Sequence, residues 1–294
     1  MTRAPLPAAL ARPSPGAALE VRDVTLRFGG LTSLDAVSLT VPRASVLAVI
    51  GPNGAGKTSL FNCLTGAYQP QQGSVVFSPE PGREIELLGR APHVVNRLGV
   101  ARTFQNIRLF PAMSALENVQ VGVESRQRSG PVATVFGLPR ARRDDRASVA
   151  RSMALLAQVG LSARAHETAS ALPYGAQRRL EIARALGTGP SLLLLDEPAA
   201  GTTPAEKAEL AELILGIAAT GISVLLIEHD MRLVTSVAAS ITVLSFGKVI
   251  ATGTPTQVQN DPAVIEAYLG TADDGTAEDA GGTPDAGAGR PGPA

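Results

Sequence analysis

The chain has 294 residues, of which 45% are apolar and 18% are charged, and its 26 basic side chains balance its 26 acidic ones. This composition excludes a disordered or fibrous protein and is typical of one large globular domain or two closely joined lobes. The balanced charge argues against a protein that holds nucleic acid or anionic lipid through its overall electrostatic field.

Both ends of the chain are predicted to be disordered. Residues 1–16 contain four prolines and no apolar run long enough for the core of a signal peptide, and residues 271–294 contain no Val, Ile, Leu or Phe. Such segments cannot offset the entropy of ordering by burying apolar surface. The folded unit is therefore expected to span residues 17–270. Within it, the uncharged stretch 233–247 is too short and too polar to span a bilayer.

Three short apolar runs are predicted to be buried parallel strands of an α/β fold. They lie at residues 46–50, 192–195 and 223–227, show little alternation and end in polar residues or glycine, as strands covered on both faces do. Alternating segments predict added antiparallel strands at 19–28, 34–41, 75–77, 241–244 and 249–251. Between residues 140 and 159 the apolar positions fall on one face of a helix, which predicts a long helical insertion between the first two core strands.

The first core strand is followed by a complete G-x-x-x-x-G-K-T sequence. Its members are Gly51, Pro52, Asn53, Gly54, Ala55, Gly56, Lys57 and Thr58, and Ser59 continues into a predicted helix. The glycines allow backbone N–H groups to turn inward around an anion at a helix N-terminus. Lys57 is expected to reach the β- and γ-phosphates, and Thr58 to offer its hydroxyl to Mg²⁺. The alternative, a glycine-rich turn with a chance lysine, is disfavoured by the flanking strand and helix.

Acidic residues follow the other two core strands. Asp196 and Glu197 end the second strand, and Glu228-His229-Asp230 end the third, so all lie at the edge where open parallel sheets bind ligands. Asp196 suits the Mg²⁺ shell, and Glu197 suits the polarisation of a water for attack on a γ-phosphate. The alternatives are a polar turn for the acidic pair and a surface or capping residue for His229. Cys63, the only cysteine, is expected to be an inert packing residue.

In chain order, these motifs and four further features resemble an ATP-binding cassette (ABC) ATPase subunit. The segment LPYGAQ at 172–177, followed by RRLEIARAL, is similar to the family's signature segment and helix. The resemblance implies nucleotide contacts for Pro173, Tyr174 and Gly175, as well as for residues 51–59. It further implies a Q-loop glutamine at Gln105 that shares the metal with Thr58 and Asp196, a switch histidine at His229, and an aromatic at Phe28 that stacks on adenine.

The resemblance covers nearly all of residues 18–270. It implies a P-loop NTPase (RecA-like) parallel sheet core with an antiparallel β subdomain, at 17–102 and 187–270, and a helical ABC subdomain at 103–186. It implies ATP and Mg²⁺ as cofactors and no nucleic acid. The implied partners are a second ATP-binding cassette in a homo- or heterodimer, two integral-membrane permease subunits and, indirectly, a periplasmic or extracellular solute-binding protein. The chain would then lie at the cytoplasmic face of the cell membrane as a peripheral subunit.

Several segments narrow the resemblance to the larger ATPase subunit of branched-chain amino-acid importers. They are ARTFQNIRLFP, YGAQRRLEIARAL, DEPAAG and ATGTPTQVQNDPAVIEAYLG. A related amide or urea importer and a soluble non-transport ABC ATPase are the alternatives, although the latter usually carries tandem cassettes or a coiled-coil insertion. A GTPase is disfavoured because no N-K-x-D string occurs, and a kinase would not need a signature segment.

The signature segment departs from the family's LSGGQ. Pro173 lacks the serine hydroxyl and the N–H, and Tyr174 replaces a glycine. One hydrogen bond to a charged group contributes about 1.5–3 kcal/mol, so we expect this segment to complete a partner's ATP site weakly and to make a heterodimer asymmetric. The loop before Pro204 also departs from the family, with Thr202-Thr203.

Two segments allow two interpretations. The basic run from Arg126 to Arg151 lacks interleaved aromatic residues, which favours a solvated helical face over a nucleic-acid or lipid-headgroup site. Residues 107–110 are either ordinary core or, by the resemblance, a surface that faces the coupling helices of a permease.

Overall fold

The structure is a computed structural model that describes residues 16–125 and 139–269. The tails expected at 1–16 and 271–294 lie outside these residues, apart from Gly16, whose carbonyl oxygen accepts a hydrogen bond from the Arg43 N–H at 2.9 Å. Much of the basic run from Arg126 to Arg151 also lies outside the described part. Within the described residues, no helix is both long and apolar enough to cross a bilayer.

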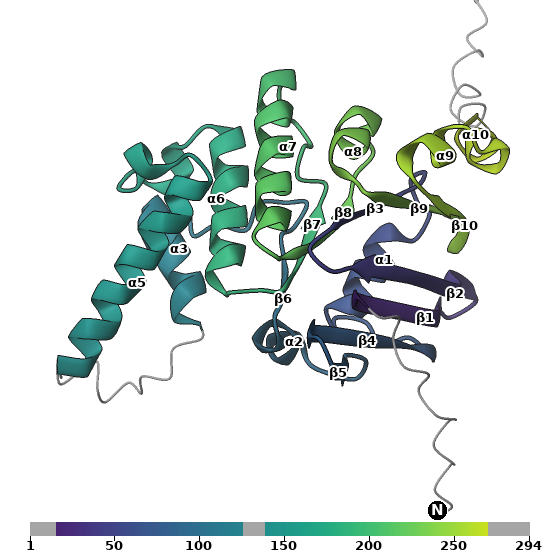
Figure 1. Ribbon diagram of the computed structural model, residues 1–294, viewed down its shortest axis with the longest axis horizontal. Helices are drawn as coiled ribbons and strands as arrows, with labels where there is room; N and C mark the ends of the chain where they lie inside the picture. Colours follow the sequence, from purple (N-terminus) through teal and green to yellow (C-terminus); the bar gives the residue numbers. More distant parts are fainter. Residues whose placement is uncertain (1–15, 126–138, 270–294) are drawn as a thin grey trace, which may run out of the picture.

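A six-stranded sheet forms the centre of the molecule, in the order β10-β9-β3-β8-β7-β6 (Figure 1). Every neighbouring pair is parallel except β10 and β9. The three predicted core strands are confirmed, and β3, β7 and β8 are buried along their whole length. The strands are β3 (Val46–Ile50), β6 (Val100–Arg102), β7 (Leu192–Asp196), β8 (Ser223–Ile227), β9 (Ser240–Ser245) and β10 (Lys248–Gly253).

The prediction that residues 241–244 form an added antiparallel strand was wrong in direction. This segment is β9, which pairs in parallel with β3 inside the main sheet and meets only β10 in antiparallel register. The pairing direction depends on where the chain re-enters the sheet, which the local alternation of side chains does not encode.

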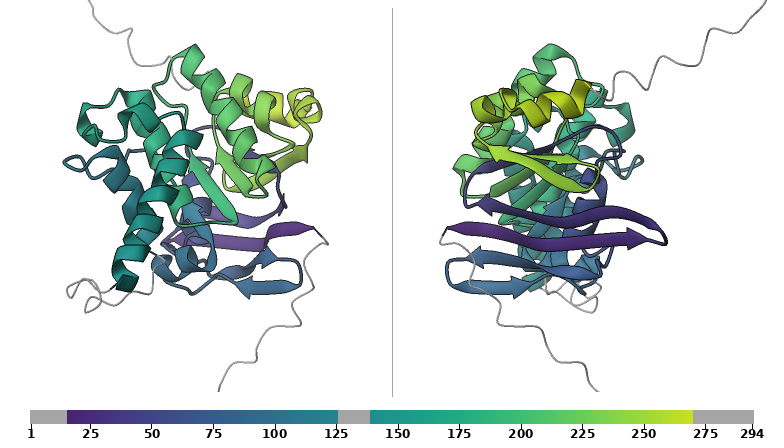
Figure 2. Two further views of the ribbon diagram at one scale, coloured as in Figure 1. Left: turned by 60° about the vertical axis from the view of Figure 1, so that its left-hand side comes forward. Right: turned by 90° about the vertical axis from the view of Figure 1, so that its right-hand side faces the viewer.

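A second, four-stranded antiparallel sheet packs below the main sheet, in the order β2-β1-β4-β5 (Figures 1 and 2). Its strands alternate buried and exposed side chains where one face meets the core. Helix α1 lies between the two sheets, where Leu60, Phe61 and Leu64 join one apolar cluster with residues of both. The strands are β1 (Ala17–Phe28), β2 (Leu31–Pro42), β4 (Gln72–Glu80) and β5 (Arg83–Glu86).

Helices cover the far end of the main sheet. Helices α3, α5 and α6 enclose a cluster that contains Leu156, Val159 and Leu180, with Val149 and Met153 packed against it, so the predicted helical face of the insertion is confirmed. Helix α6 also packs on the main sheet through Ile182 and Leu186. The helices are α1 (Lys57–Leu64), α2 (Pro92–Leu98), α3 (Ala115–Glu124), α5 (Pro139–Gln158), α6 (Tyr174–Gly187), α7 (Pro204–Ala219), α8 (Met231–Val237), α9 (Pro255–Gln259) and α10 (Pro262–Leu269).

Candidate functional site

A glycine-rich loop connects the carboxyl end of β3 to α1. Gly51, Gly54 and Gly56 all have positive φ, at 149°, 78° and 100°. A Cβ on Gly51 would lie 2.0 Å from the carbonyl oxygen of Leu244, and one on Gly56 would lie 2.6 Å from that of Ser33. A Cβ on Gly54 would meet no atom within 4 Å. Packing therefore requires glycine at two positions, and the third borders open space where a ligand can approach the backbone.

The remaining loop residues close the turn. Ala55 is buried, and its N–H donates to the carbonyl oxygen of Pro52 at 3.2 Å. The carbonyl oxygen of Ala55 accepts from the N–H of Gly247 at 3.0 Å, which connects the loop to the turn between β9 and β10. Asn53 is exposed at the tip of the loop.

Lys57 is the first residue of α1 and is only 8% exposed. Its Nζ donates to the carbonyl oxygens of Gly51 at 2.5 Å and Pro52 at 2.9 Å. Burial lowers the pKa of Lys57, whereas the nearby carboxylates of Glu197 and Asp196 act in the opposite direction. The ammonium group thus lies inside the loop and within electrostatic reach of both acids.

The next two residues of α1 differ in environment. Thr58 is exposed at the N-terminus of the helix. Ser59 is half-buried, and its Oγ accepts a hydrogen bond from the Oγ of Ser33 at 2.7 Å. Ser59 therefore fixes α1 against β2, while Thr58 is open to solvent in the first turn of α1.

Asp196, the last residue of β7, is paired with a buried arginine. Its Oδ2 lies 2.7 Å from Nη2 of Arg102, and the two side chains are 6% and 8% exposed. The other Nη of Arg102 donates to Oδ1 of Asn62 at 2.7 Å, and the guanidinium lies over the rings of Phe61 and Phe104. Arg102 was not among the predicted residues, because the three-residue strand β6 that carries it is recognisable only through its pairing with β7.

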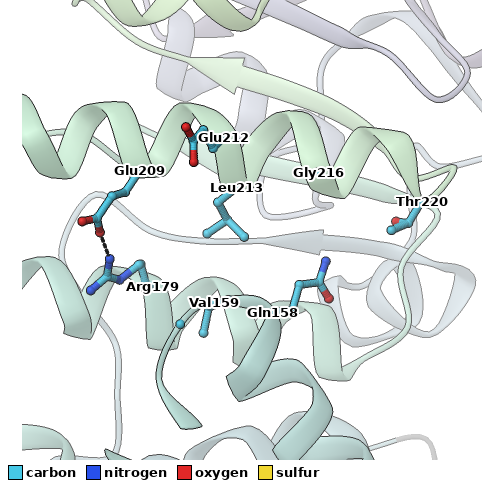
Figure 3. A pocket seen from close by; sticks show the side chains of 9 residues that line it. Gln158, Val159, Arg179, Glu209, Glu212, Leu213, Gly216 and Thr220 are labelled. Carbon is cyan, nitrogen blue, oxygen red and sulfur yellow. Dashed lines mark hydrogen bonds and ion pairs between the residues drawn. The ribbon is translucent and has the colours of Figure 1, made fainter. Parts of the chain in front are cut away.

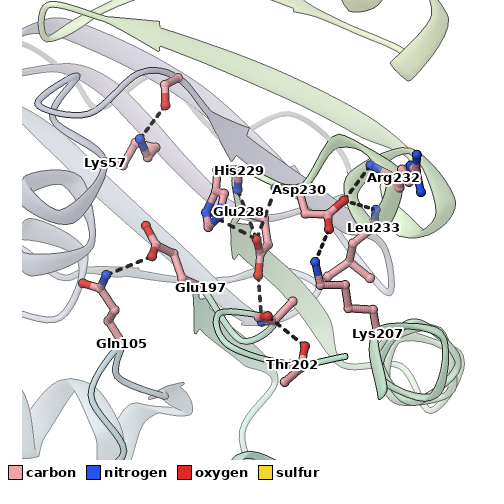
Figure 4. Close-up of polar contacts among 12 residues, drawn as sticks. Lys57, Gln105, Glu197, Thr202, Lys207, Glu228, His229, Asp230, Arg232 and Leu233 are labelled. Atoms are coloured by element: carbon pink, nitrogen blue, oxygen red, sulfur yellow. Dashed lines mark hydrogen bonds and ion pairs between the residues drawn. The ribbon is translucent and has the colours of Figure 1, made fainter. Parts of the chain in front are cut away.

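Glu197 adopts a backbone conformation that is rare for a residue with a side chain. Its φ is 45°, and its N–H donates to the carbonyl oxygen of Ile227 at 2.9 Å, which fastens the turn to β8. Oε2 of Glu197 accepts a hydrogen bond from Nε2 of Gln105 at 2.9 Å (Figure 4). Strained backbone of this kind concentrates at functional sites, where the surrounding structure holds it in place.

The third core strand ends in a buried glutamate that the sequence argument left without a role. Glu228 is fully buried, and its carboxylate accepts N–H bonds from Ala199 at 2.8 Å, His229 at 3.1 Å and Asp230 at 3.4 Å. Burial raises the pKa of Glu228, and these N–H groups act against that rise. Asp230 in turn pairs with Lys207 of α7 at 2.6 Å (Figure 4). Glu228 thus fixes the backbone around His229 and the loop after β7 at once.

His229 itself has a side chain that is 63% exposed, with Nδ1 3.8 Å from Oε2 of Glu228. In Figure 4 it lies between Lys57 on one side and Asp230 on the other, with Glu197 and Gln105 below Lys57. The histidine is therefore placed at the predicted sheet edge with its ring open to solvent.

An aromatic pair stands at the hairpin between β1 and β2. Phe28 is 46% exposed, and its ring meets that of Tyr68 edge to face at a centroid distance of 5.2 Å. Strand β2 continues from this hairpin to Ser33, which contacts the glycine-rich loop. Tyr68, a second exposed aromatic beside Phe28, was missed because it lies outside any motif.

The signature segment opens helix α6. Pro173 is the N-cap residue, one position before the first helical turn, and Tyr174 is 45% exposed. A Cβ on Gly175 would lie 2.1 Å from Oε1 of Glu206, so the carboxylate of this α7 residue packs directly against the start of α6. In Figure 1, α6 lies on the other side of α7 from β3. The structure therefore brings residues 51–59, Asp196, Glu197, Gln105 and His229 to one edge of the sheet and leaves residues 173–175 apart from the glycine-rich loop.

The residues at this edge fit Mg²⁺ that arrives with a phosphate ligand. Thr58, Gln105 and Asp196 offer a hydroxyl, an amide and one carboxylate, and no group of three His, Cys, Asp or Glu side chains in the described chain could hold a metal by itself. Mg²⁺ commonly takes one or two carboxylates, and substrate phosphates and waters complete its octahedron.

A cleft of about 540 Å³ lies elsewhere, between α6 and α7 (Figure 3). An ion pair between Arg179 and Glu209 crosses it, and Leu213 forms part of its apolar lining. None of the residues predicted for the site lines this cleft.

The comparisons with known proteins agree with this geometry. Residues 34–200 match the family model described as ABC transporter. The chain belongs to the ABC transporter family. Residues 248–274 of this ABC protein also match the model described as branched-chain amino acid ATP-binding cassette transporter.

The ABC chain aligns with individual relatives over almost their whole length. It is 46% identical over 255 residues to the high-affinity branched-chain amino acid transport ATP-binding protein BraF of Pseudomonas aeruginosa, covering 86% of this chain and 98% of the relative. LivG of Escherichia coli, whose name describes the same role, is 43% identical with the same coverage. A solved ATP-binding cassette of an ABC transporter in its ADP conformation is 30% identical, with a TM-score of 0.74 over 86% of this chain and 99% of that one. The predicted family and the predicted fold class are both confirmed.

Proposed function

We propose that this chain binds and hydrolyses Mg–ATP at the carboxyl-terminal edge of β3, β8 and β7, and that it couples this reaction to the uptake of branched-chain amino acids. The observation that carries the proposal is the convergence of the glycine-rich loop, Asp196 and the Gln105–Glu197 pair at one sheet edge. The names of BraF and LivG and the match at residues 248–274 supply the solute class.

The residues at this sheet edge have different roles in phosphoryl transfer. The backbone N–H groups of residues 51–56 and the ammonium of Lys57 would hold the phosphates, and Thr58, Gln105 and Asp196 would hold Mg²⁺. The metal would supply neutralisation of the negative charge on the phosphates. Phe28, with Tyr68 beside it, offers a stacking surface for adenine.

Glu197 takes the proton of the attacking water. The water oxygen forms a bond to the γ-phosphorus, the bond between that phosphorus and the bridging oxygen of the β-phosphate breaks, and ADP and inorganic phosphate leave. Gln105 orients the carboxylate of Glu197 through the 2.9 Å hydrogen bond. His229, whose N–H is held by Glu228 at the same edge, would act near the γ-phosphate.

A second cassette completes the site. Pro173, Tyr174 and Gly175 lie apart from the glycine-rich loop of their own chain, so they are positioned to face the nucleotide of a partner across a dimer. Pro173 has no N–H to donate at the N-cap of α6, and the contribution of this chain to its partner's site is accordingly the weaker one.

Membrane permeases dock beside α3. Phe110, Met113 and Val121 are exposed apolar side chains in this part of the molecule, and a groove of about 260 Å³ is lined by Phe110, Val121 and Arg184 among others. The groove lies between the helical subdomain, which we assign to 103–186, and the core, which we assign to 17–102 and 187–270. The chain would then be held at the cytoplasmic face of the membrane.

The test is solute uptake by cells that lack this chain. Removal is expected to abolish high-affinity uptake of labelled leucine, and the wild-type chain to restore it. Lys57→Ala should fail to restore uptake, whereas Arg83→Ala, at an exposed side chain of β5, should restore it fully. Unchanged leucine uptake together with loss of amide or urea uptake would show that the chain serves a related amide or urea importer instead.

A further inference from the structure

Side chains of the signature helix α6 form hydrogen bonds with the backbone of the Q-loop, the segment 103–108 that carries Gln105. Two α6 side chains, Arg178 and Glu181, make these contacts, and both are buried, at 4% and 2% exposed. They form an ion pair with each other at 3.6 Å. The loop that orients Glu197 is therefore fastened to the helix that begins with the signature segment.

Arg178 holds the carbonyl oxygens of the Q-loop. Its Nη1 donates to the oxygen of Phe104 at 2.8 Å, and its Nη2 donates to the oxygen of Gln105 itself. A guanidinium is a planar fork with fixed donor directions. Its two donors can thus fix both the position and the orientation of the peptide that carries the Gln105 side chain.

Glu181 holds the N–H groups of the same segment. Its Oε1 accepts from Phe104 and from Arg108, both at 3.3 Å. Phe104 is therefore held through its N–H by one α6 side chain and through its carbonyl oxygen by the other. This pairing leaves the Q-loop little freedom to move independently of α6.

Tyr174, in the signature segment, contacts both Arg178 and the loop after Glu197. Its hydroxyl accepts a hydrogen bond from Nη2 of Arg178 at 2.9 Å, and the Arg178 guanidinium lies 5.3 Å from the centre of the Tyr174 ring. A Cβ added to Gly201 would lie 3.3 Å from that ring. Tyr174, which replaces a signature glycine, therefore connects the start of α6 to the Q-loop, through Arg178, and to the loop that follows Glu197.

We propose that Arg178, braced by Tyr174 and Glu181, is a positioning residue for Gln105, so that the placement of the signature helix sets the orientation of Glu197. This inference rests on the proposed role of the Gln105–Glu197 pair in ATP hydrolysis. Because Arg178 holds backbone atoms and α6 carries the signature segment, a shift of α6 moves Gln105 with it. The signature tyrosine then acts within its own chain as well as across a dimer.

The experiment is a double-mutant cycle on ATP hydrolysis by the full chain. Arg178→Lys keeps the charge but removes the fork, and Gln105→Ala removes the side chain through which Arg178 acts. Arg178→Lys is expected to lower kcat about tenfold or more, since small misplacements of catalytic groups are costly, with KM for ATP changed by less than about twofold. In the Gln105→Ala background the same substitution is expected to change kcat by less than about twofold, because coupled residues are not additive.

Two further variants separate this role from a general effect on α6. Arg179→Lys alters the neighbouring arginine, which pairs with Glu209 across the cleft of Figure 3, and is expected to leave kcat unchanged. Tyr174→Phe removes only a hydroxyl from an exposed ring, and it is expected to lower kcat about two- to threefold in the wild-type background alone. If Arg178→Lys does not fold, the Tyr174→Phe cycle decides the question.

The outcomes distinguish the positioning role of Arg178 from the proposed role of the chain in ATP hydrolysis. An equal loss of kcat from Arg178→Lys, or from Tyr174→Phe, with and without Gln105 would overturn the positioning role and leave the proposed function intact. If Gln105→Ala alone leaves kcat unchanged, the role of Gln105 in the proposed function fails, and the positioning role fails with it.

Discussion

Nη2 of Arg102 lies 2.7 Å from Oδ2 of Asp196, so the carboxylate at the end of β7 is held by a buried guanidinium. The same arginine bonds Asn62 of α1 and lies over two aromatic rings. It thus connects β6, β7 and α1. One arginine therefore holds the carboxylate at the end of β7 against the helix that follows the glycine-rich loop.

Replacement of Arg102 by methionine should destabilise the protein markedly. The substitution leaves Asp196 and Asn62 buried without their partner, and loss of one member of a buried ion pair costs about 3–5 kcal/mol. Urea unfolding of Arg102→Met measures this free energy. The matched control is Arg83→Met at an exposed ion pair with Glu80, where a change below about 1 kcal/mol is expected. Equal shifts of the urea unfolding midpoint for the two variants would contradict the stabilising role of Arg102 between Asp196 and Asn62.

The glycines of the glycine-rich loop at 51–56 should respond very differently to alanine. Gly51→Ala places a Cβ 2.0 Å from a backbone oxygen that cannot rotate away, so a loss of about 3 kcal/mol or more in unfolding free energy is expected. Gly54→Ala meets open space and should lose only the cost of a left-handed alanine, about 1–2 kcal/mol. Thermal unfolding of both variants checks the order, and a reversed order would show that the loop packs differently.

Cys63 should be unreactive in the folded protein. The thiol is buried in α1, and burial raises its pKa to about 11 from 9.0. A shift of two units makes the thiolate about a hundredfold scarcer than in the unfolded chain between neutral pH and pH 8. A thiol-reactive chromogenic disulfide at pH 8 should therefore label the urea-unfolded chain rapidly and the native chain hardly at all. Because the chain has one cysteine, rapid native labelling would place Cys63 at the surface.

The same shift gives stability a definite dependence on pH. Between pH 9 and 11 the unfolded chain releases the thiol proton while the folded chain retains it, so the contribution of Cys63 to the unfolding free energy falls as pH rises. Cys63→Ser should remove this slope, which is at most about 1.4 kcal/mol per pH unit. Urea titrations of both chains across that window measure the difference. Identical slopes would exclude the thiol as their source.

Much of the site was predictable because its motifs are local. The loop at 51–58 needs glycines in sequence, and the acidic residues after β7 and β8 follow buried apolar runs that reveal the strands. The sheet edge then follows from parallel strand direction alone. Cys63 was likewise predictable as a buried packing residue, because it lies on a helix that follows a buried strand.

The rest depends on contacts between distant segments. Strand β6 has three residues and is recognisable only through its pairing with β7, and the direction of β9 is set by its pairing with β3. Arg102 and Glu228 act through partners 94 and 29 positions away. The resemblance implied a nucleotide contact for Tyr174, whereas the hydrogen bond that its hydroxyl accepts from Arg178 appears only in the folded structure.

The most direct test of the account is phosphate release by Glu197→Gln in a single turnover. The amide cannot take a proton from water, so hydrolysis is expected to slow about 10²–10⁴-fold, while binding of a fluorescent ATP analogue stays within about twofold of wild type. Glu209→Gln, an exposed glutamate outside the site, should hydrolyse ATP at the wild-type rate. Phosphate release by Glu197→Gln at the wild-type rate would contradict the assignment of Glu197 as the base of ATP hydrolysis.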